Sequence, residues 1–141
     1  MGVAGTVKID HEYLREVLES FEAAKLSTTN LDELEENGLP CDEEHIHKLA
    51  FHMELLEDQG MIESVISDGI GFTRDANGNF ILSIVPLRLT ASGHDFLADI
   101  RQEGVWETLR SKFHDASVYT IISIAKKLAS TAATNMIDSR L

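Results

Sequence analysis

Several residue types that mark particular classes of protein are scarce in this chain of 141 residues. It contains a single cysteine, Cys41, which excludes an internal disulfide and indicates a reducing compartment. No apolar run approaches the roughly 18 residues that a membrane-spanning helix needs. No basic segment followed by an apolar one stands at its beginning. We therefore expect a cytoplasmic protein that does not enter a membrane.

Basic residues are also scarce, and their distribution is uneven. The chain holds 12 Lys and Arg against 24 Asp and Glu, a formal net charge of −12. Residues 1–70 hold 17 acidic and four basic side chains, a net of −13, whereas residues 71–141 hold seven acidic and eight basic, a net of +1. A strongly negative surface repels a phosphate backbone and attracts cationic partners. The charge therefore favours a basic protein partner and disfavours nucleic acid.

The patterns typical of catalytic, metal or phosphate-binding sites are missing too. On a helix, His45 and His47 would point about 200° apart, so they cannot share one metal ion. His94 and Asp95 would diverge by about 100°, and no suitable nucleophile accompanies them. His52 falls on the apolar side of its predicted helix and is expected to be a hydrogen-bonded core residue. No glycine-rich phosphate loop follows a strand. We expect no catalytic residue, no metal and no cofactor.

The content of hydrophobic residues, 43%, is sufficient for one packed domain. Residues 1–8 are interpreted as a flexible tail. Asp10 is a suitable N-cap for a helix that continues to about Lys25. Apolar residues recur in this helix at the spacing of one buried face, namely at Leu14, Val17, Leu18 and Phe21.

Two further helices are predicted before any strand. The first is short and is capped by Thr29 or Asn30. The second extends from Glu43 to Gln59, with Asp42 as its cap and Gly60 just after its end. Three short helices followed by a hairpin are the order of elements in a helix-turn-helix protein.

A β-hairpin is predicted after the third helix. Its strands would be Met61 to Ser67 and Asn79 to Val85, and Asn77 followed by glycine is typical of a tight hairpin turn. Arg74 and Asn77 would then lie at the tip of the wing. The sequence thus predicts a mainly α protein with a small β-hairpin (α+β), in which residues 9–90 form a winged helix-turn-helix core.

Residues 91–141 are predicted to form two to three additional helices packed on the same domain. The last of these starts near Ser117 and has an apolar face larger than a small core needs. A dimer seam between two copies of this helix is one explanation, and packing against the first helix is another. The residues of the predicted seam are Ile121, Ile122, Ala125, Leu128 and Ala132.

Three segments carry motifs of a known family: Lys8–Leu18, Phe51–Ile62, and Arg88–Leu97 followed by Trp106. The first is similar to a Lys-Arg-Asp and Leu-Ile-Arg-x-Ile-Leu motif, and the second to Tyr-His-x-x-Leu-Leu followed by Gly-Leu-Ile. Together they resemble a bacterial and phage family, domain of unknown function 2513. The chain departs from it at Ala91, where the family usually has tryptophan. The resemblance implies a winged-helix-like fold and a setting among phages, prophages and mobile elements, but no activity.

Two functions remain open. Element order and the position of Arg74 favour a DNA-binding transcriptional regulator of the winged-helix type. The preferred interpretation is a non-catalytic protein-interaction module with an acidic face for a basic partner, because carboxylates on a recognition helix would repel phosphate. The predicted acidic face consists of Asp42, Glu43, Glu44, Glu54, Glu57 and Asp58.

Overall fold

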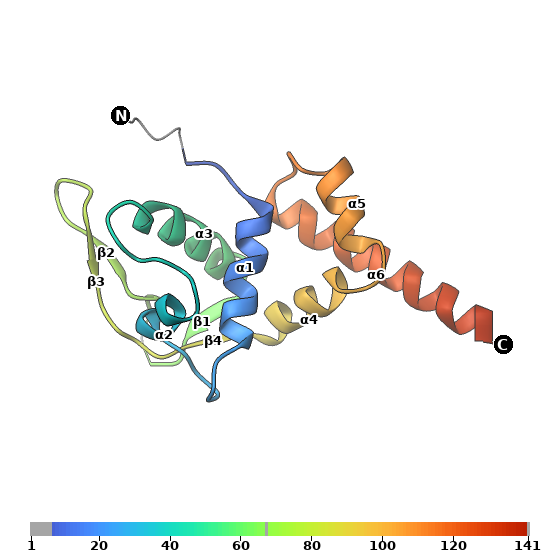
Figure 1. Ribbon diagram of the computed structural model, residues 1–141, viewed down its shortest axis with the longest axis horizontal. Helices are drawn as coiled ribbons and strands as arrows, with labels where there is room; N and C mark the ends of the chain where they lie inside the picture. The colour runs from blue at the N-terminus through green and yellow to red at the C-terminus, as the bar shows by residue number, and fades with distance from the viewer. Residues whose placement is uncertain (1–6, 67, 141) are drawn as a thin grey trace.

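The computed structural model describes residues 7–66 and 68–140, so most of the predicted tail, residues 1–8, lies outside the described part. Within that part the protein is a mixed α+β structure with six helices and two small two-stranded sheets (Figure 1). The helices and strands are α1 (His11–Glu22), α2 (Leu31–Glu36), α3 (Ile46–Asp58), β1 (Ile62–Ser64), β2 (Phe72–Arg74), β3 (Phe80–Leu82), β4 (Leu87–Leu89), α4 (Ala91–Ile100), α5 (Val105–Lys112) and α6 (Val118–Arg140).

Helix α1 begins where the sequence predicts. The side chain of Asp10 accepts a hydrogen bond from the Tyr13 backbone N–H at 3.1 Å, which satisfies one of the free donors of the first turn. The helix ends at Glu22, slightly before the predicted Lys25. Its buried residues are the four predicted ones, Leu14, Val17, Leu18 and Phe21.

A side-chain cap also sets the start of α2, and a glycine follows the end of α3. The Asn30 side chain accepts a hydrogen bond from Glu33 N–H at 2.9 Å and thereby caps α2. Regular helix in α3 starts only at Ile46. The predicted cap, Asp42, lies in the turn before the helix, where its carboxylate accepts a hydrogen bond from His45 N–H at 3.1 Å. Gly60 follows the end of α3 with φ of 70°, a left-handed conformation in which glycine has no steric penalty.

The strand pairing differs from the predicted hairpin. The segment after α3 pairs with β4, with Ile62 opposite Leu89, and not with Asn79 to Val85. On its other edge β4 exchanges two 2.7 Å backbone hydrogen bonds with Thr29, so β4 is bonded on both sides. The predicted pairing was wrong because β4 is too short to be recognised from the sequence. Its two buried residues, Leu87 and Leu89, flank the exposed Arg88, and three residues are too few to reveal the alternation of a strand.

The predicted tight turn does exist, but it joins β2 to β3. Phe72 lies opposite Leu82 and Arg74 opposite Phe80. Gly78 has φ of 83°, the conformation that the Asn-Gly pair predicts. The chain therefore has a separate β2–β3 hairpin inserted between β1 and β4 (Figure 1).

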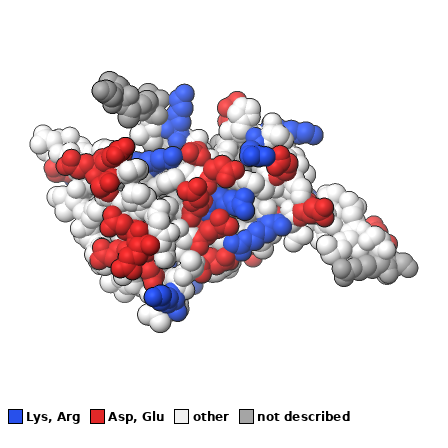
Figure 2. Space-filling model, viewed as in Figure 1, with Lys and Arg blue, Asp and Glu red and all other residues white. Residues whose placement is uncertain are grey.

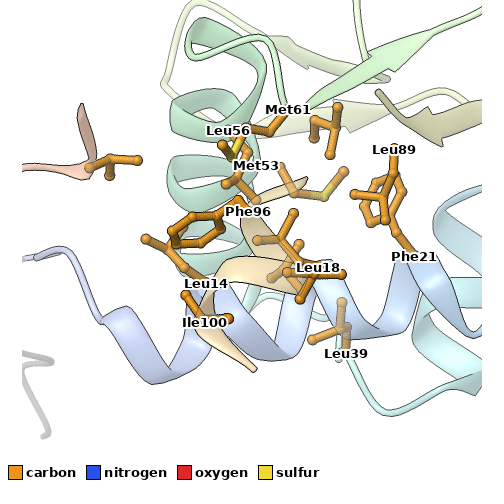
Figure 3. Packing of buried hydrophobic residues seen from close by; sticks show 14 of the residues in the cluster. Leu14, Leu18, Phe21, Leu39, Met53, Leu56, Met61, Leu89, Phe96 and Ile100 are labelled. Atoms are coloured by element: carbon orange, nitrogen blue, oxygen red, sulfur yellow. The ribbon is translucent and has the colours of Figure 1, made fainter. Parts of the chain in front are cut away.

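One core joins α1, α3 and α4, as Figure 3 shows for side chains from all three helices. Thr90 caps α4 by accepting a hydrogen bond from Gly93 N–H at 3.2 Å. Glycine is required at position 93 because a Cβ atom there would lie 2.3 Å from the Met61 carbonyl oxygen. The first part of α6 packs on α4 and α5, and its C-terminal part projects from the body (Figure 1).

Candidate functional site

The β2–β3 hairpin covers part of the outer side of α3. The ring of His47 meets that of Phe80 edge-on, with centroids 5.0 Å apart. The Arg74 guanidinium donates hydrogen bonds of 2.9 and 2.6 Å to the two Glu54 carboxylate oxygens and lies 4.7 Å from the centroid of Phe80. His47 and Glu54 on the outer side of α3 thus contact the chain's own hairpin.

Of the two predicted wing-tip residues, only Asn77 lies in the turn of the hairpin. Its backbone N–H donates to the Asp75 carboxylate at 2.8 Å, and its side chain is exposed. Arg74 is the last residue of β2 and is held against α3 by Glu54. It is therefore not presented at the tip to an external phosphate.

The six predicted acidic residues do not form one face. Asp42–Glu44 precede α3, whereas Glu54, Glu57 and Asp58 belong to its last turns, so roughly 12 to 18 Å of helix separates the two groups. Glu54 is neutralised by the hairpin. The pKa of Glu57 is raised by partial burial and then by the nearby charges of Asp58 and Glu54.

A second group of carboxylates, which the sequence analysis did not select, lies beside Asp42. Burial raises the pKa of the Cys41 thiol to about 11, and the charges of Glu35, Asp32 and Asp42 contribute to the increase. The Glu35 carboxylate also accepts a hydrogen bond from Cys41 N–H at 3.3 Å. Four groups from α2 and the turn before α3 are therefore neighbours. The amphipathic pattern of α2, with Leu31 inside, was the signal that could have identified its outer acids.

We define the acidic patch as the exposed carboxylates of α2 and of the turn before α3. In Figure 2 acidic side chains gather over α2 in the left half of the view. Within the described chain, none of its members pairs with a lysine or arginine, although Asp42 is 2.5 Å from the Nδ1 atom of His45. This hydrogen bond lowers the pKa of Asp42. The acidic patch consists of Asp32, Glu35, Glu36, Asp42, Glu43 and Glu44.

The arginines of the molecule are used internally. Every arginine whose side chain the structure describes forms an ion pair with a glutamate. The pairs are Arg15 with Glu19 at 3.6 Å, Arg74 with Glu54 at 2.6 Å, Arg88 with Glu63 at 2.7 Å, Arg101 with Glu22 at 2.7 Å, and Arg110 with Glu107 at 2.7 Å. Arginine is the side chain best suited to bidentate phosphate recognition, and these five are already engaged.

A cleft of about 950 Å³ lies where the N-terminal ends of α1 and α3 approach α5. Trp106 of α5 forms part of its wall and donates a hydrogen bond from Nε1 to a Glu12 carboxylate oxygen at 3.0 Å. Two members of the acidic patch, Glu43 and Glu44, also line it. This cleft was not predictable from the sequence, since its walls come from residues about 100 positions apart.

Next to the cleft, His52 joins α3 to the start of α1. Its side chain is fully buried, its Nδ1–H donates to Lys48 C=O at 2.7 Å, and its Nε2 accepts from Asp10 N–H at 2.9 Å. These bonds define the neutral tautomer, and burial lowers the pKa of His52. The prediction of a hydrogen-bonded core histidine is confirmed. The family-like segments Lys8–Leu18 and Phe51–Ile62 thus meet at this hydrogen bond.

The predicted dimer seam on α6 is partly internal. Ile121 and Ala125 are 2% and 0% exposed within the single chain. Ile122, Leu128 and Ala132 are half-buried. Helix α6 packs on α4 and α5, so the alternative explanation, packing against the first helix, does not describe the main contact. Intramolecular burial accounts for the innermost part of the apolar face.

Residues 7–66 and 68–140 contain neither a cluster of metal-binding side chains nor a membrane-spanning helix. No three His, Cys, Asp or Glu side chains in these ranges are arranged to hold a metal ion. None of the helices in the same ranges combines the length and the apolar character required to cross a bilayer.

A family model matches residues 8–119, which is more than half of the chain, and its description is "Hypothetical protein (DUF2513)". The chain belongs to this family. The resemblance based on three segments is thereby confirmed. An uncharacterized protein of Haemophilus influenzae is 26% identical over 89 residues, which cover 63% of this chain and 68% of that protein. No solved structure matches the chain. Neither name describes an activity, a ligand or a partner.

Proposed function

We propose that this protein is a non-catalytic interaction module that binds a basic protein through the acidic patch. The observation that carries the proposal is the contrast in pairing within the described chain. Five arginines are paired with glutamates, while the six carboxylates of the patch have no lysine or arginine partner. Carboxylates that no lysine or arginine neutralises attract a cationic partner and increase its association rate.

The core of this module is proposed to be winged-helix-like. The order α1, α2, α3, β1, β4 supports this assignment, as does the position of β4 between β1 and Thr29. The β2–β3 hairpin would then be an elongated wing folded against α3. We further propose a cytoplasmic location and a setting in phages, prophages or other mobile elements, as the family resemblance implies.

A DNA-binding regulator is the second candidate, and the same order of elements favours it. Two features of the surface weigh against it. Phosphate neutralisation supplies most non-specific affinity for DNA, and the five paired arginines would have to leave their glutamates to provide it. In addition, the hairpin occupies part of the outer side of α3 through Phe80 and Arg74.

A homodimer through the outer side of α6 also stays a prediction. Leu128 is half-buried and is available for such a contact. Sedimentation of the full-length protein and of Leu128→Lys tests it. A dimer that the variant reduces to a monomer would support the seam, and a monomeric wild-type protein would contradict it.

The acidic patch is tested by two variants of equal charge. Glu35→Lys/Glu36→Lys reverses the patch on α2, and the control Glu103→Lys/Asp138→Lys reverses two exposed acids elsewhere. Fluorescence anisotropy with labelled decalysine measures binding. We expect the patch variant to weaken binding by at least about tenfold and the control by no more than about twofold. Equal weakening would mean that net charge alone governs binding, and the proposed site would be rejected.

A further inference from the structure

The cleft between α1, α3 and α5 is more acidic than its composition suggests. Besides the imidazoles of His11, His47 and His114, its lining has four carboxylates and three lysine or arginine side chains: Asp10, Glu12, Glu43, Glu44, Lys8, Lys48 and Arg110. Lys48 is bonded to Asp10 at 3.0 Å and Arg110 to Glu107 at 2.7 Å. Three carboxylates therefore face one ammonium group, that of Lys8, which has no ion-pair partner in the described chain.

One wall of the cleft is apolar and held in a fixed orientation. The hydrogen bond to Glu12 positions the indole N–H of Trp106, and the Arg15 guanidinium lies 5.1 Å from the ring centroid. The half-buried side chain of Ile9 contributes further apolar surface to the lining. An aromatic ring of fixed orientation beside free carboxylates can receive an apolar side chain and a cationic one together.

We propose that this cleft receives a basic peptide segment of the partner protein. An apolar side chain of that segment packs against Trp106 and Ile9, and an adjacent lysine or arginine pairs with Glu43 and Glu44. The inference rests on the proposed function and gives it a location, because these two glutamates belong to both the acidic patch and the cleft. A volume of about 950 Å³ accommodates several side chains but no folded domain.

The occupant is expected to be cationic rather than anionic because of the charges that remain free in the cleft. Apart from the imidazoles of His11, His47 and His114, an anionic ligand would find only the ammonium group of Lys8, and it would lie near Glu12, Glu43 and Glu44. Like charges at such distances repel, and the cost rises when water is excluded. Binding of an anionic probe is therefore the outcome that contradicts the assignment most simply.

Trp106 is the only tryptophan of the chain, so its emission reports directly on the cleft. The probe is a capped heptapeptide of alternating lysine and leucine, and the matched control peptide has glutamate in place of lysine. We expect a saturable change in emission with the lysine peptide and none with the glutamate peptide. Glu43→Gln/Glu44→Gln should weaken the lysine peptide by at least about tenfold, and Glu35→Gln/Glu36→Gln by no more than about twofold.

The outcomes separate the cleft from the wider proposal. Unchanged affinity in Glu43→Gln/Glu44→Gln, with a native circular dichroism spectrum, would overturn the cleft assignment. An emission change with the glutamate peptide would also overturn it. If Glu35→Lys/Glu36→Lys still weakened decalysine selectively, the acidic patch would stand without the cleft. If neither pair of glutamates mattered, both proposals would fail.

Discussion

The carboxylates of α1 and those of α2 belong to the same residue types but have different surroundings. On α1, the carboxylates of Glu19 and Glu22 form ion pairs of 3.5 and 2.7 Å with the guanidinium of Arg101, the residue that follows α4. On α2, Glu35 and Glu36 have no lysine or arginine partner within the described residues. The acids of α1 therefore take part in the packing of the chain on itself, and those of α2 remain available. Pairing, and not the number of acids, distinguishes a structural surface from a candidate binding surface.

The largest loss of stability is expected from a substitution at His52, which joins α3 to the start of α1. His52→Ala removes the partner of Asp10 N–H and leaves a cavity between α1 and α3. We expect the free energy of unfolding to fall by about 2–4 kcal/mol. Urea unfolding followed by circular dichroism measures the change. The control His94→Ala, at an exposed position, should stay within about 0.5 kcal/mol. A similar loss in both variants would contradict the role given to His52.

The pH dependence of stability should have opposite signs at His52 and His45. Burial lowers the pKa of His52, so the folded state binds its proton less readily than the unfolded state. Its stabilising contribution is present above the unfolded pKa of about 6.5 and is lost as pH falls below it. The hydrogen bond to Asp42 raises the pKa of His45, so its contribution is present below about pH 6.5 and is lost as pH rises through the folded pKa.

The contributions of these two histidines are distinguished by measuring the denaturant midpoints of the wild type and of each variant between about pH 5 and 8. His52→Asn should reduce the loss of stability on acidification, because the buried group that resists protonation is gone. His45→Gln should increase that loss, since it removes the opposing contribution beside the acidic patch. A steeper acid loss in His52→Asn would contradict the assignment.

A smaller loss of stability is expected when the ion pairs between α1 and Arg101 are removed. Arg101→Gln breaks the ion pairs with Glu19 and Glu22, which are solvent-exposed. Exposed pairs of this kind contribute about 0.2–1 kcal/mol, and salt should reduce the difference. Thermal unfolding of the variant and the wild type at low and high salt measures both quantities. A loss that does not diminish with salt would indicate that Arg101 acts through packing instead.

The smallest effect on stability should come from the carboxylates of α2. Glu36→Gln removes a charge that has no lysine or arginine partner among the residues described, so the free energy of unfolding should change by less than about 0.5 kcal/mol. Because neighbouring like charges repel, any change at low salt should be towards greater stability. A clear destabilisation would show that Glu36 has a structural role, and the comparison with α1 would lose its basis.

Local signals made much of the fold predictable. Asp10 caps the helix that the sequence assigned to it, and Asn30, one of the two residues predicted to cap the second helix, caps α2. Thr90 caps α4, and each of these caps is a contact between residues three positions apart. Gly60 ends α3 for an equally local reason. The pairing of β1 with β4 was not predictable, because it depends on which of several short apolar segments fits beside Thr29 in the folded chain.

The candidate site was less predictable than the fold. Glu22 and Arg101 are separated by 79 residues, and no local pattern indicates their bidentate pair. Glu54 was assigned to the acidic face from helical periodicity, although the hairpin brings Arg74 onto it. The excess of acidic charge in residues 1–70 follows from the sequence itself, but sequence reasoning could not tell which carboxylates the fold would neutralise.

The proposed preference for a cationic partner over nucleic acid is tested by two parallel titrations of the wild-type protein at low ionic strength. One labelled ligand is decalysine, and the other is a duplex DNA of random sequence. We expect saturable binding of decalysine that weakens as salt is added, and no binding of the duplex. Micromolar binding of the duplex with a steep salt dependence would contradict the proposed preference and would favour the DNA-binding regulator.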